Sequence, residues 1–318
     1  MNSINSNDKD FCFLLNIKEY LEKYGFKRSL NWISGLVSCY GFSYVNDFTD
    51  ENIGEFILGR SYSFEKMFQI FIENISNAIC VTINTSIVYS YIKNHIDNCI
   101  DILIWVNDRY LNYSPYYNKV DFFSLIIVKK IGLSTTEIFD SEMRVIDTNI
   151  LIRAANCNDK TRLVYIQDKI VWLKNEFSMM KNSLNLIVDS FNTKNLEYKI
   201  GNEGIFAFIN DISVFNKEQL YKICYEMNRA CGPKITRRNM RNFLHEFNNK
   251  YDVSYTNSIN LLSELEQMWT MTGNLIYKLS VTLDLSLRQR IIDYAKDIIK
   301  LENSFLQMLK NEYILNLE

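Results

Sequence analysis

Cys12 is the residue of this chain that best fits a chemical nucleophile. It directly precedes the run FLLNIKEYLEKYGF, in which Phe13 and Ile17 begin an apolar pattern at helical spacing that Gly25 ends. The sequence therefore predicts a helix with Asp10 as its N-cap and Cys12 in its first turn. A thiol at that position faces unpaired N–H groups and the positive end of the helix dipole, and both lower the pKa of a thiol. The competing interpretation is a small buried hydrophobe.

The other cysteines and the two histidines offer weaker sites. Three cysteines lie in apolar runs and are expected in the core: Cys39, Cys80 and Cys99. Cys224 and Cys231 lack the spacing of metal ligands, and no CxxC pair occurs, so we expect reduced thiols, no metal site and no cofactor. His95 and His245 are the only histidines, and each lies among charged or amide residues, where it is expected to face solvent.

Two further clusters have both a functional and a structural interpretation. Arg237, Arg238 and Arg241 share one predicted helix, where they form either a receptor for a phosphate or carboxylate or a solvated face. Four tyrosines in a connection turned at Pro115 either line an acyl or aromatic pocket or pack under a long loop: Tyr110, Tyr113, Tyr116 and Tyr117.

The overall composition excludes several classes of protein. The chain has 318 residues, of which 47% are hydrophobic and 23% charged, and this is typical of globular proteins. Thirty-five basic residues against 37 acidic ones give a net charge of -2, which argues against a nucleic-acid or anionic-membrane partner. The first residues lack the basic and apolar regions of a signal peptide, and no apolar run reaches about 20 residues. We therefore expect a cytoplasmic protein.

The hydrophobic period divides the chain into two parts. Helical patterns come first, and then consecutive strands are expected at ICVTI, IDILIWVN, FSLIIVKKIG and TEIFDSE, which indicates an α+β domain with an antiparallel sheet. From about residue 150 onward only helices are expected, beginning with TRLVYIQDKIVWLKNEF, and Gly232 is expected to end one of them. The predicted domains are residues 1–155 and 156–318. The second is expected to dock beside Cys12 and to bury Trp172, Phe243 and Trp269.

Several segments, in order, resemble one protein family. DFCFLLNIKEYLEKYGF and LNWISGLVSCYGFSY are similar to the start of the butirosin biosynthesis protein H family, with Gly35, Gly41, Phe42 and Tyr44 at its glycine-marked segment. ILIWVNDRYLNYSPYYNKVDFFSLIIVKKIG and IFDSE look like its following strands. The second part is similar to the family's helical C-terminal domain, whose hallmarks fall on Gly232, Arg238 or Arg241, Phe243, Leu244 and Trp269.

The resemblance implies a papain-like, C39-like N-terminal domain and a thiol mechanism. Cys12 stands at the family's nucleophile position and Asp140 at that of the orienting acid, while Ser124 occupies the place of the expected histidine. Serine cannot accept the thiol proton at neutral pH. The tyrosines of the Pro115 connection are the candidate substrate-binding residues, on the functional interpretation given above.

Three functions stay open at this point. The first is a cysteine-dependent acyltransferase or amide synthase of thiotemplated natural-product biosynthesis, or a related amidohydrolase, which takes an acyl thioester from an acyl or peptidyl carrier protein and passes it from Cys12 to an amine. The second is a catalytically degenerate binding or scaffold protein of the same fold. The third is a small-molecule binding module without thiol chemistry. Homo-oligomerisation is left open. A Ser124→His variant is expected to speed alkylation of Cys12.

Overall fold

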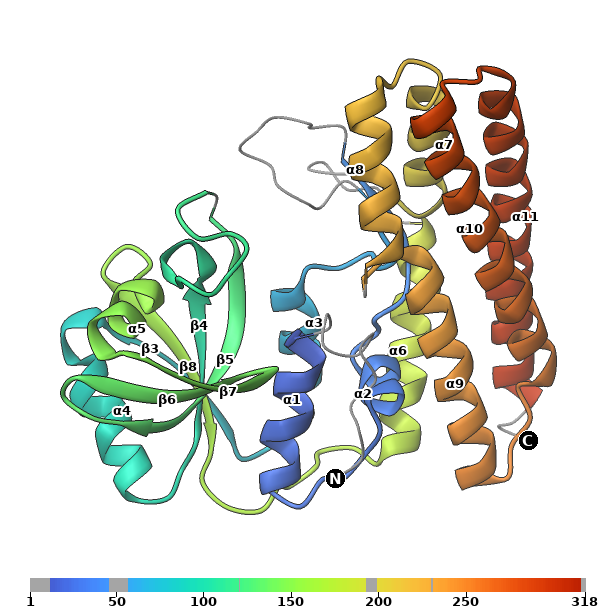
Figure 1. Ribbon diagram of the computed structural model, residues 1–318. Coiled ribbons are helices and arrows are strands. Elements are labelled where there is room, and N and C mark those ends of the chain that lie inside the picture. Colours follow the sequence, from blue (N-terminus) through green and yellow to red (C-terminus); the bar gives the residue numbers. More distant parts are fainter. Residues whose placement is uncertain (1–11, 46–56, 120, 193–198, 230, 316–318) are drawn as a thin grey trace. The chain divides into compact units, whose positions relative to one another are not determined.

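The chain forms two compact units that do not follow the predicted boundary at residue 155. The computed structural model describes residues 12–45, 57–119, 121–192, 199–229 and 231–315 (Figure 1). One unit, here called the sheet unit, comprises residues 1–33 and 68–173, and the other, the helical unit, comprises residues 34–67 and 174–318. The molecule is α+β, as the sequence predicts.

A six-stranded antiparallel sheet is the centre of the sheet unit. Its strands follow the order β3-β8-β4-β5-β6-β7, and every neighbouring pair is antiparallel. The strand bounds, in that order, are Ala78–Asn84, Lys160–Ile166, Ile102–Asn107, Phe123–Ile131, Thr135–Asp140 and Glu142–Asp147. The four expected strands are therefore present, and the last one continues into a hairpin that turns at Ser141, where φ is 55°.

Strand β8 contradicts the prediction that only helices follow residue 150. Lys160–Ile166 lies between β3 and β4, near the middle of the sheet. Its last four residues, Leu163 to Ile166, are all buried. Because burial on both faces removes the alternation of apolar and polar residues, such a strand cannot be distinguished from a buried helix by its hydrophobic period. The next helix, α6, begins only at Glu176.

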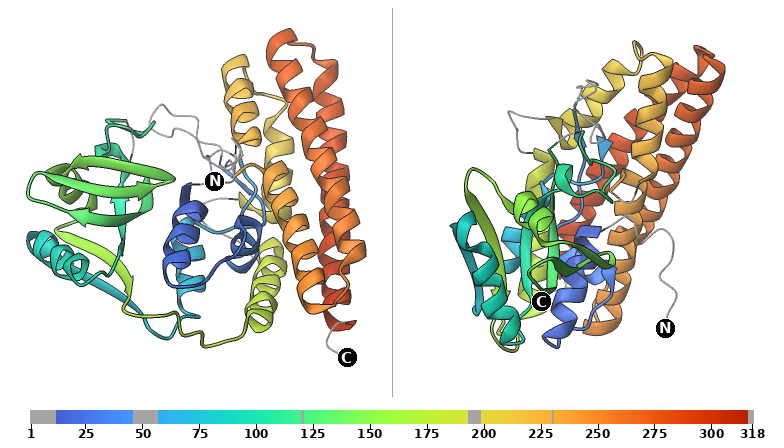
Figure 2. Two further views of the ribbon diagram at one scale, coloured as in Figure 1. Left: turned by 60° about the horizontal axis from the view of Figure 1, so that its bottom comes forward. Right: turned by 60° about the vertical axis from the view of Figure 1, so that its left-hand side comes forward.

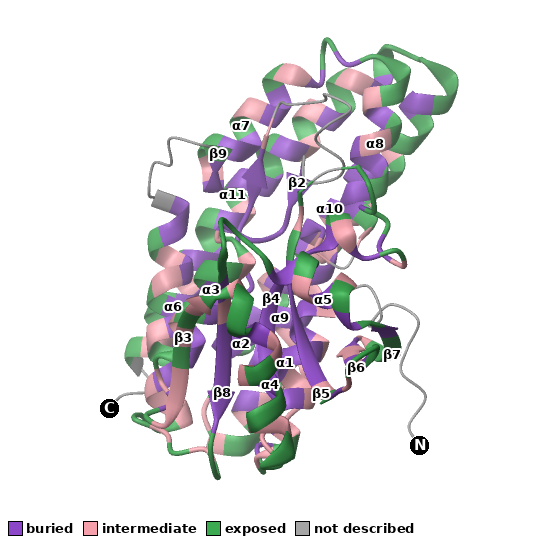
Figure 3. Ribbon diagram, turned by 90° about the vertical axis from the view of Figure 1, so that its left-hand side faces the viewer, coloured by how far each residue is buried: buried purple, intermediate pink, exposed green. Residues whose placement is uncertain are grey.

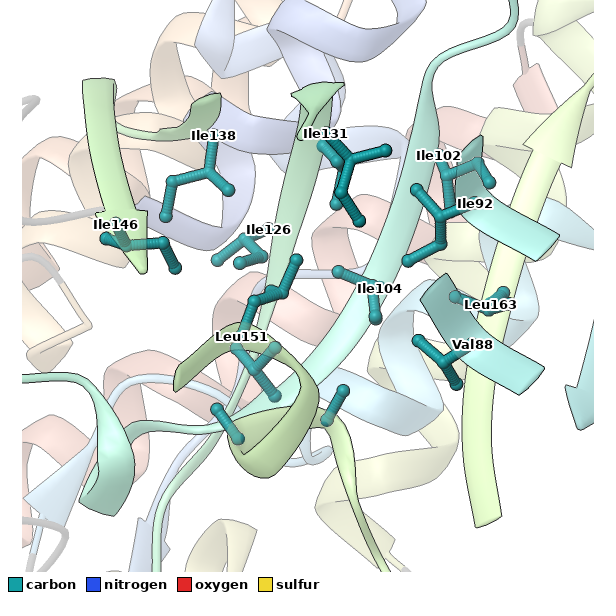
Figure 4. Close-up of a cluster of buried hydrophobic side chains, with 14 of the residues drawn as sticks. Val88, Ile92, Ile102, Ile104, Ile126, Ile131, Ile138, Ile146, Leu151 and Leu163 are labelled. Carbon is teal, nitrogen blue, oxygen red and sulfur yellow. The ribbon is translucent and has the colours of Figure 1, made fainter. Parts of the chain in front are cut away.

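Helices cover both faces of this sheet. One face packs against α4 (Val88–Asp97) and α5 (Thr148–Ala155) through a core that includes Ile104 and Ile126 (Figure 4). The alternate residues point the other way, toward α1 (Cys12–Lys23), which contacts β5 and β6. Figure 3 shows β4 and β5 buried along most of their length, since helices lie on both sides.

The helical unit combines a small sheet with a set of long helices. The helices are α6 (Glu176–Asn192), α7 (Gly201–Asp211), α8 (Lys217–Asn228), α9 (Pro233–Tyr251), α10 (Thr256–Thr282) and α11 (Ser286–Leu315). The last two lie side by side over most of their length (Figure 2). Short strands β2 (Ile57–Leu58), β1 (Ser43–Tyr44) and β9 (Lys199–Ile200) form a three-stranded sheet, so the prediction of an all-α second domain is incomplete.

Individual predictions for this part of the chain had mixed outcomes. Trp269 and Phe243 are buried, as expected. Trp172 is instead half-buried and belongs to the sheet unit, where it contacts Phe26. Gly232 does not end α8. It is the N-cap of α9, with Pro233 as the first helical residue, an arrangement in which proline has no N–H to leave unsatisfied. Among the described residues, no helix has the length and apolarity that a bilayer crossing requires.

Candidate functional site at one end of the sheet

Cys12 is the first residue of helix α1, which confirms its predicted place in the first turn. Its side chain is half-buried, and no cysteine of the chain is in a disulfide. The predicted N-cap, Asp10, lies outside the described residues. At this position the thiol lies next to the N-terminal N–H groups of α1, which have no partner within the helix and can stabilise a thiolate or an oxyanion.

Contacts along α1 show which end of the sheet its N-terminus approaches. Lys23, at the far end of the helix, pairs at 2.6 Å with Asp101, which directly precedes β4. Asn16, one turn after Cys12, reaches the backbone of Leu125 near the start of β5. A helix rises about 1.5 Å and a strand about 3.3 Å per residue, so Cys12 lies about two strand residues before Leu125, level with Phe123. The thiol therefore belongs to the end where β5 begins and β6 ends.

Asn16 is a buried polar residue at that end, and the sequence analysis missed it. Its Nδ2 donates to the carbonyl of Leu125 at 2.7 Å, and its Oδ1 accepts from the N–H of Ser141 at 2.8 Å. In the register that pairs Ile127 with Phe139, Leu125 and Ser141 would be the next partners. The Asn16 amide therefore replaces a hydrogen bond of the ladder. The signal in the sequence was an asparagine on the apolar face of a predicted helix.

Asp140 is linked directly to α1 through this amide. Asn16 Nδ2 also donates to Asp140 Oδ1 at 3.1 Å, and Asp140 is the last residue of β6. Burial raises the pKa of the Asp140 carboxyl, and the hydrogen bond from Asn16 opposes that rise. The structure thus brings Asp140 to the helix that carries Cys12.

Ser124 belongs to a second pair at the same end of the sheet. Its Oγ donates to Asp108 Oδ1 at 2.5 Å, and Ser114 Oγ donates to the other carboxylate oxygen at 3.2 Å. Asp108 directly follows β4, in the short helix η2 (Asp108–Tyr110). Burial raises the pKa of Asp108 to about 7, and the charge of Asp140 raises it further, while the two serine hydrogen bonds lower it. Sequence analysis gave no role to Asp108.

The alternation along β5 separates Ser124 from the face on which α1 packs. Ser124 has the same orientation as Ile126, whose side chain belongs to the core with α4 and α5. Leu125 points to the opposite face, and its carbonyl accepts the Asn16 hydrogen bond. The structure therefore joins Ser124 to Asp108, and Asp140 to Asn16, but it does not point Ser124 toward α1.

The four predicted substrate-binding tyrosines do not form one surface. Tyr113 lies beside the two carboxyls, and burial followed by the charges of Asp140 and Asp108 raises the pKa of its hydroxyl. Tyr116 is buried and stacks on Phe122 at 4.3 Å. The remaining two differ from these: Tyr110 packs under the guanidinium of Arg153, and Tyr117 is 42% exposed.

A groove of about 500 Å³ occurs instead in the helical unit. Exposed Tyr221 on α8 and Tyr277 on α10 line it, together with Val281. None of the four tyrosines predicted to bind substrate contributes to it.

The only histidine of the sheet unit is remote from this end of the sheet. The His95 ring packs against those of Tyr91 and Tyr165, at 4.5 and 4.4 Å, and it is half-buried, so it is only partly exposed to solvent. Tyr165 neighbours the first residue of β4, because Leu103 pairs with Val164. Asp108 follows the last residue of that strand, about 20 Å away at 3.3 Å per residue. His245 lies on α9, exposed as predicted.

Other predicted chemistry-bearing residues are structural or exposed. Arg237 is fully buried and binds Glu302, whereas Arg241 pairs with Glu266 at 2.6 Å, so these arginines do not form one anion receptor. Cys39 is buried, but the prediction of a core position for Cys80 and Cys99 is wrong, because both are exposed. Cys80 lies on β3, an edge strand, and Cys99 lies in a turn with φ of 61°.

A search of the described residues for metal-binding groups and comparisons of the sequence with known proteins both gave negative results. Within the described ranges, no three histidine, cysteine or acidic side chains gather in a group that could hold a metal ion. No protein-family model matches the chain, and no curated protein matches it.

Proposed function

We propose that the chain is a cysteine-dependent acyltransferase or amide synthase of thiotemplated natural-product biosynthesis, with Cys12 as the nucleophile in a papain-like sheet unit. The observation that carries this proposal is the position of Cys12 as the first residue of α1, one turn before an amide that is hydrogen-bonded to Asp140. A thiol, a helix N-terminus and a buried acid at one end of an antiparallel sheet suit acyl transfer.

The reaction has two half-steps. The Cys12 sulfur forms a bond to the acyl carbon of a carrier-bound thioester, the bond from that carbon to the carrier sulfur breaks, and the proton from Cys12 passes to the carrier thiol. In the second step the acceptor amine forms a bond to the same carbon, the bond to Cys12 breaks, and a proton from the amine returns to the Cys12 sulfur. The N–H groups at the start of α1 stabilise the negative oxygen in both steps.

A catalytically degenerate binding protein of the same fold is the second candidate, and a specific observation favours it. The residue at the expected histidine position, Ser124, donates to Asp108 and points away from the face of α1. The sheet unit's own histidine, His95, packs at the opposite end of the sheet. Loss of a positioned general base reduces a rate by about 10²–10⁴. This candidate would bind a carrier protein or product without turnover.

Acylation of the intact chain tests the proposal. The protein is incubated at pH 7.5 with a series of acyl N-acetylcysteamine thioesters, and peptide mass spectrometry then locates the acyl group. We expect modification at Cys12, loss of the label when a primary amine is added, and no label at that peptide in Cys12→Ala.

Exposed cysteines provide the matched control. In Cys80→Ala and Cys99→Ala, Cys12 should be acylated at the wild-type rate, because Cys80 lies on the edge strand β3 and Cys99 lies beside Lys23, at the opposite end of α1 from Cys12. If Cys12 reacts no faster than Cys80 and Cys99, acyl transfer by this thiol is excluded and the binding function becomes the better proposal.

A further inference from the structure

Asn16 occupies an unusual place for a polar side chain in the middle of a helix. It is fully buried, and its residue neighbours on the same face of α1 are apolar. Burying an amide is unfavourable unless its donors and acceptors are satisfied. Here both sides are satisfied, and the three hydrogen bonds go to β5, to the end of β6 and to the turn residue Ser141 rather than to α1 itself.

The three contacts have different consequences. The bonds to the Leu125 carbonyl and the Ser141 N–H replace backbone pairing at the point where β5 and β6 separate. Those two groups belong to the backbone and cannot move without opening the sheet. The third bond, to Asp140, adds an ionisable group to the same amide. Asn16 therefore attaches α1 both to the backbone of the sheet and to the Asp140 carboxyl.

Cys12 lies on the same face of α1 as Asn16, four residues earlier. Side chains four residues apart on a helix are neighbours, with Cβ atoms about 6 Å apart. The hydrogen bonds that hold Asn16 in place therefore also hold the helical turn that begins with Cys12.

We propose that Asn16 is the positioning residue of Cys12: it holds the N-terminal turn of α1 at the end of the sheet where β5 begins and β6 ends, and the amide that binds the Asp140 carboxyl lies one helical turn after Cys12. A role of Asn16 in catalysis rests on the proposed acyl transfer, whereas its effect on the reactivity of the Cys12 thiol can be measured without any acyl donor. Asn16 does not itself contact the acyl group.

The titration of Cys12 measures this arrangement. The described ionisable groups at this end of the sheet include the pair Arg109 and Asp121, together with Asp108, Tyr113, Asp140, Glu142 and Arg144. Asn16→Asp adds one more carboxylate beside Asp140, keeps an acceptor for Ser141 and removes the donor to the Leu125 carbonyl. Since a nearby negative charge disfavours a thiolate, the midpoint of Cys12 alkylation should move to higher pH, with a rate about 3- to 10-fold lower at pH 7.

A charge-balanced double variant separates positioning from misfolding. In Asn16→Asp with Asp140→Asn, the amide and the carboxylate exchange places, so the number of carboxylates is that of the wild type. Iodoacetamide labelling of the Cys12 peptide, followed between pH 5 and 10, should return to within about twofold of the wild type. Asn94→Asp, at an exposed position of α4, is the control that adds the same charge elsewhere and should leave the profile unchanged.

Hydrogen exchange supplies a second readout that does not involve the thiol. Asn16→Ala leaves the Ser141 N–H without its acceptor, so exchange in the turn between β6 and β7 should become at least about tenfold faster, while β4 stays protected. The proposal is overturned if Asn16→Asp leaves the alkylation midpoint unchanged while the circular dichroism spectrum is that of the wild type, or if Asn16→Ala does not alter exchange in that turn.

Different experimental results would exclude the positioning role of Asn16 and the proposed acyl transfer. Shifted alkylation in Asn16→Asp supports the positioning role even if no thioester acylates Cys12. Acylation of Cys12 that is unaffected in rate and pH profile by both Asn16 variants overturns the positioning role and leaves acyl transfer intact.

Discussion

The two units of the molecule each bury a cluster of charged or ionisable groups, and they compensate the burial in opposite ways. In the helical unit, Glu302 accepts from Nε of Arg237 at 2.9 Å and from Tyr40 at 2.7 Å, and both members of the ion pair are fully buried. In the sheet unit, Asp108 and Asp140 receive hydrogen bonds from serine and asparagine side chains, and no ion pair to either carboxyl occurs within the described residues.

This difference decides whether each buried carboxyl group carries a proton near neutral pH. A buried carboxylate that accepts two guanidinium N–H groups on one oxygen and a phenol on the other has its charge neutralised and its lone pairs occupied. A buried carboxyl beside another carboxyl is more stable when protonated, and this raises the pKa of Asp108 to about 7. The ionic network therefore joins parts of a fold, whereas the carboxyl cluster changes its charge near neutral pH. Groups of the second kind concentrate at functional sites.

The network in the helical unit joins segments that are far apart in the sequence. Arg237 on α9 also donates to the carbonyl of Gly41 at 2.6 Å, and Trp269 on α10 donates to Glu302 on α11 at 3.4 Å. Residues 34–67 thus belong to the helical unit partly through a guanidinium that bonds to their backbone.

The largest effect is expected from removing the cation of this network. Arg237→Met leaves Glu302 buried without its partner, and breaking a buried pair in this way costs about 3–5 kcal/mol. Denaturant unfolding followed by hydrogen exchange in each unit should show the loss in the helical unit. A change below about 1 kcal/mol would contradict the comparison drawn between the two clusters.

Neutralising the carboxyl cluster should have the opposite sign. The folded pKa of Asp108 lies above its ordinary value of 3.8, so the folded state binds this proton more tightly than the unfolded state does. Stability from this group is therefore fully present below about pH 4 and is lost as the pH rises to about 7. Asp108→Asn should raise the free energy of unfolding at pH 8 by about 2–4 kcal/mol and flatten its dependence on pH between 4 and 7.

An exposed aspartate provides the control for that measurement. Asp97→Asn, on the surface end of α4, should change neither the stability at pH 8 nor the slope by more than about 0.5 kcal/mol. If Asp108→Asn destabilises the sheet unit at pH 8 as well as at pH 5, the carboxylate form is the one that the fold favours.

Restoring a histidine at Ser124 should fail, and this revises the expectation from sequence. The Ser124 side chain is 5% exposed, donates to Asp108 and shares the face of α4 and α5. An imidazole there is expected to destabilise the sheet unit by about 1–3 kcal/mol. The rate of Cys12 alkylation by iodoacetamide at pH 7 should not rise. A tenfold faster alkylation in Ser124→His would show that residue 124 does reach the thiol.

The smallest effect is expected at a partly exposed ion pair. Arg241 pairs with Glu266, and their side chains are 26% and 17% exposed. Arg241→Met should cost at most about 1 kcal/mol, because both side chains of the pair are partly exposed and water screens the interaction. Both arginines lie on α9, so comparing the loss of unfolding free energy in Arg241→Met with that in Arg237→Met separates the effect of burial from the effect of losing an arginine.

The sequence by itself determined most elements of the fold through their hydrophobic periods. The start of α1 at Cys12, the strands β4 and β5 and the helices from α7 onward agree with the predictions. The helices have an exposed face, so their period shows in the sequence, whereas β4 and β5 are buried on both faces and were recognised as short apolar runs rich in β-branched residues. The place of Cys12 at the start of a helix is likewise a local property.

Only the tertiary structure decided how those elements combine. Burial on both faces concealed β8, and the assignment of residues 34–67 to the helical unit depends on contacts across almost 200 positions, such as Arg237 with Gly41. The site shows the same limit. Sequence reasoning named Asp140 and Ser124, but the partners Asn16 and Asp108 lie more than 100 and 16 positions away from them, respectively. Which polar groups meet at the end of a sheet depends on strand order, register and side-chain orientation, and no local pattern encodes these three properties.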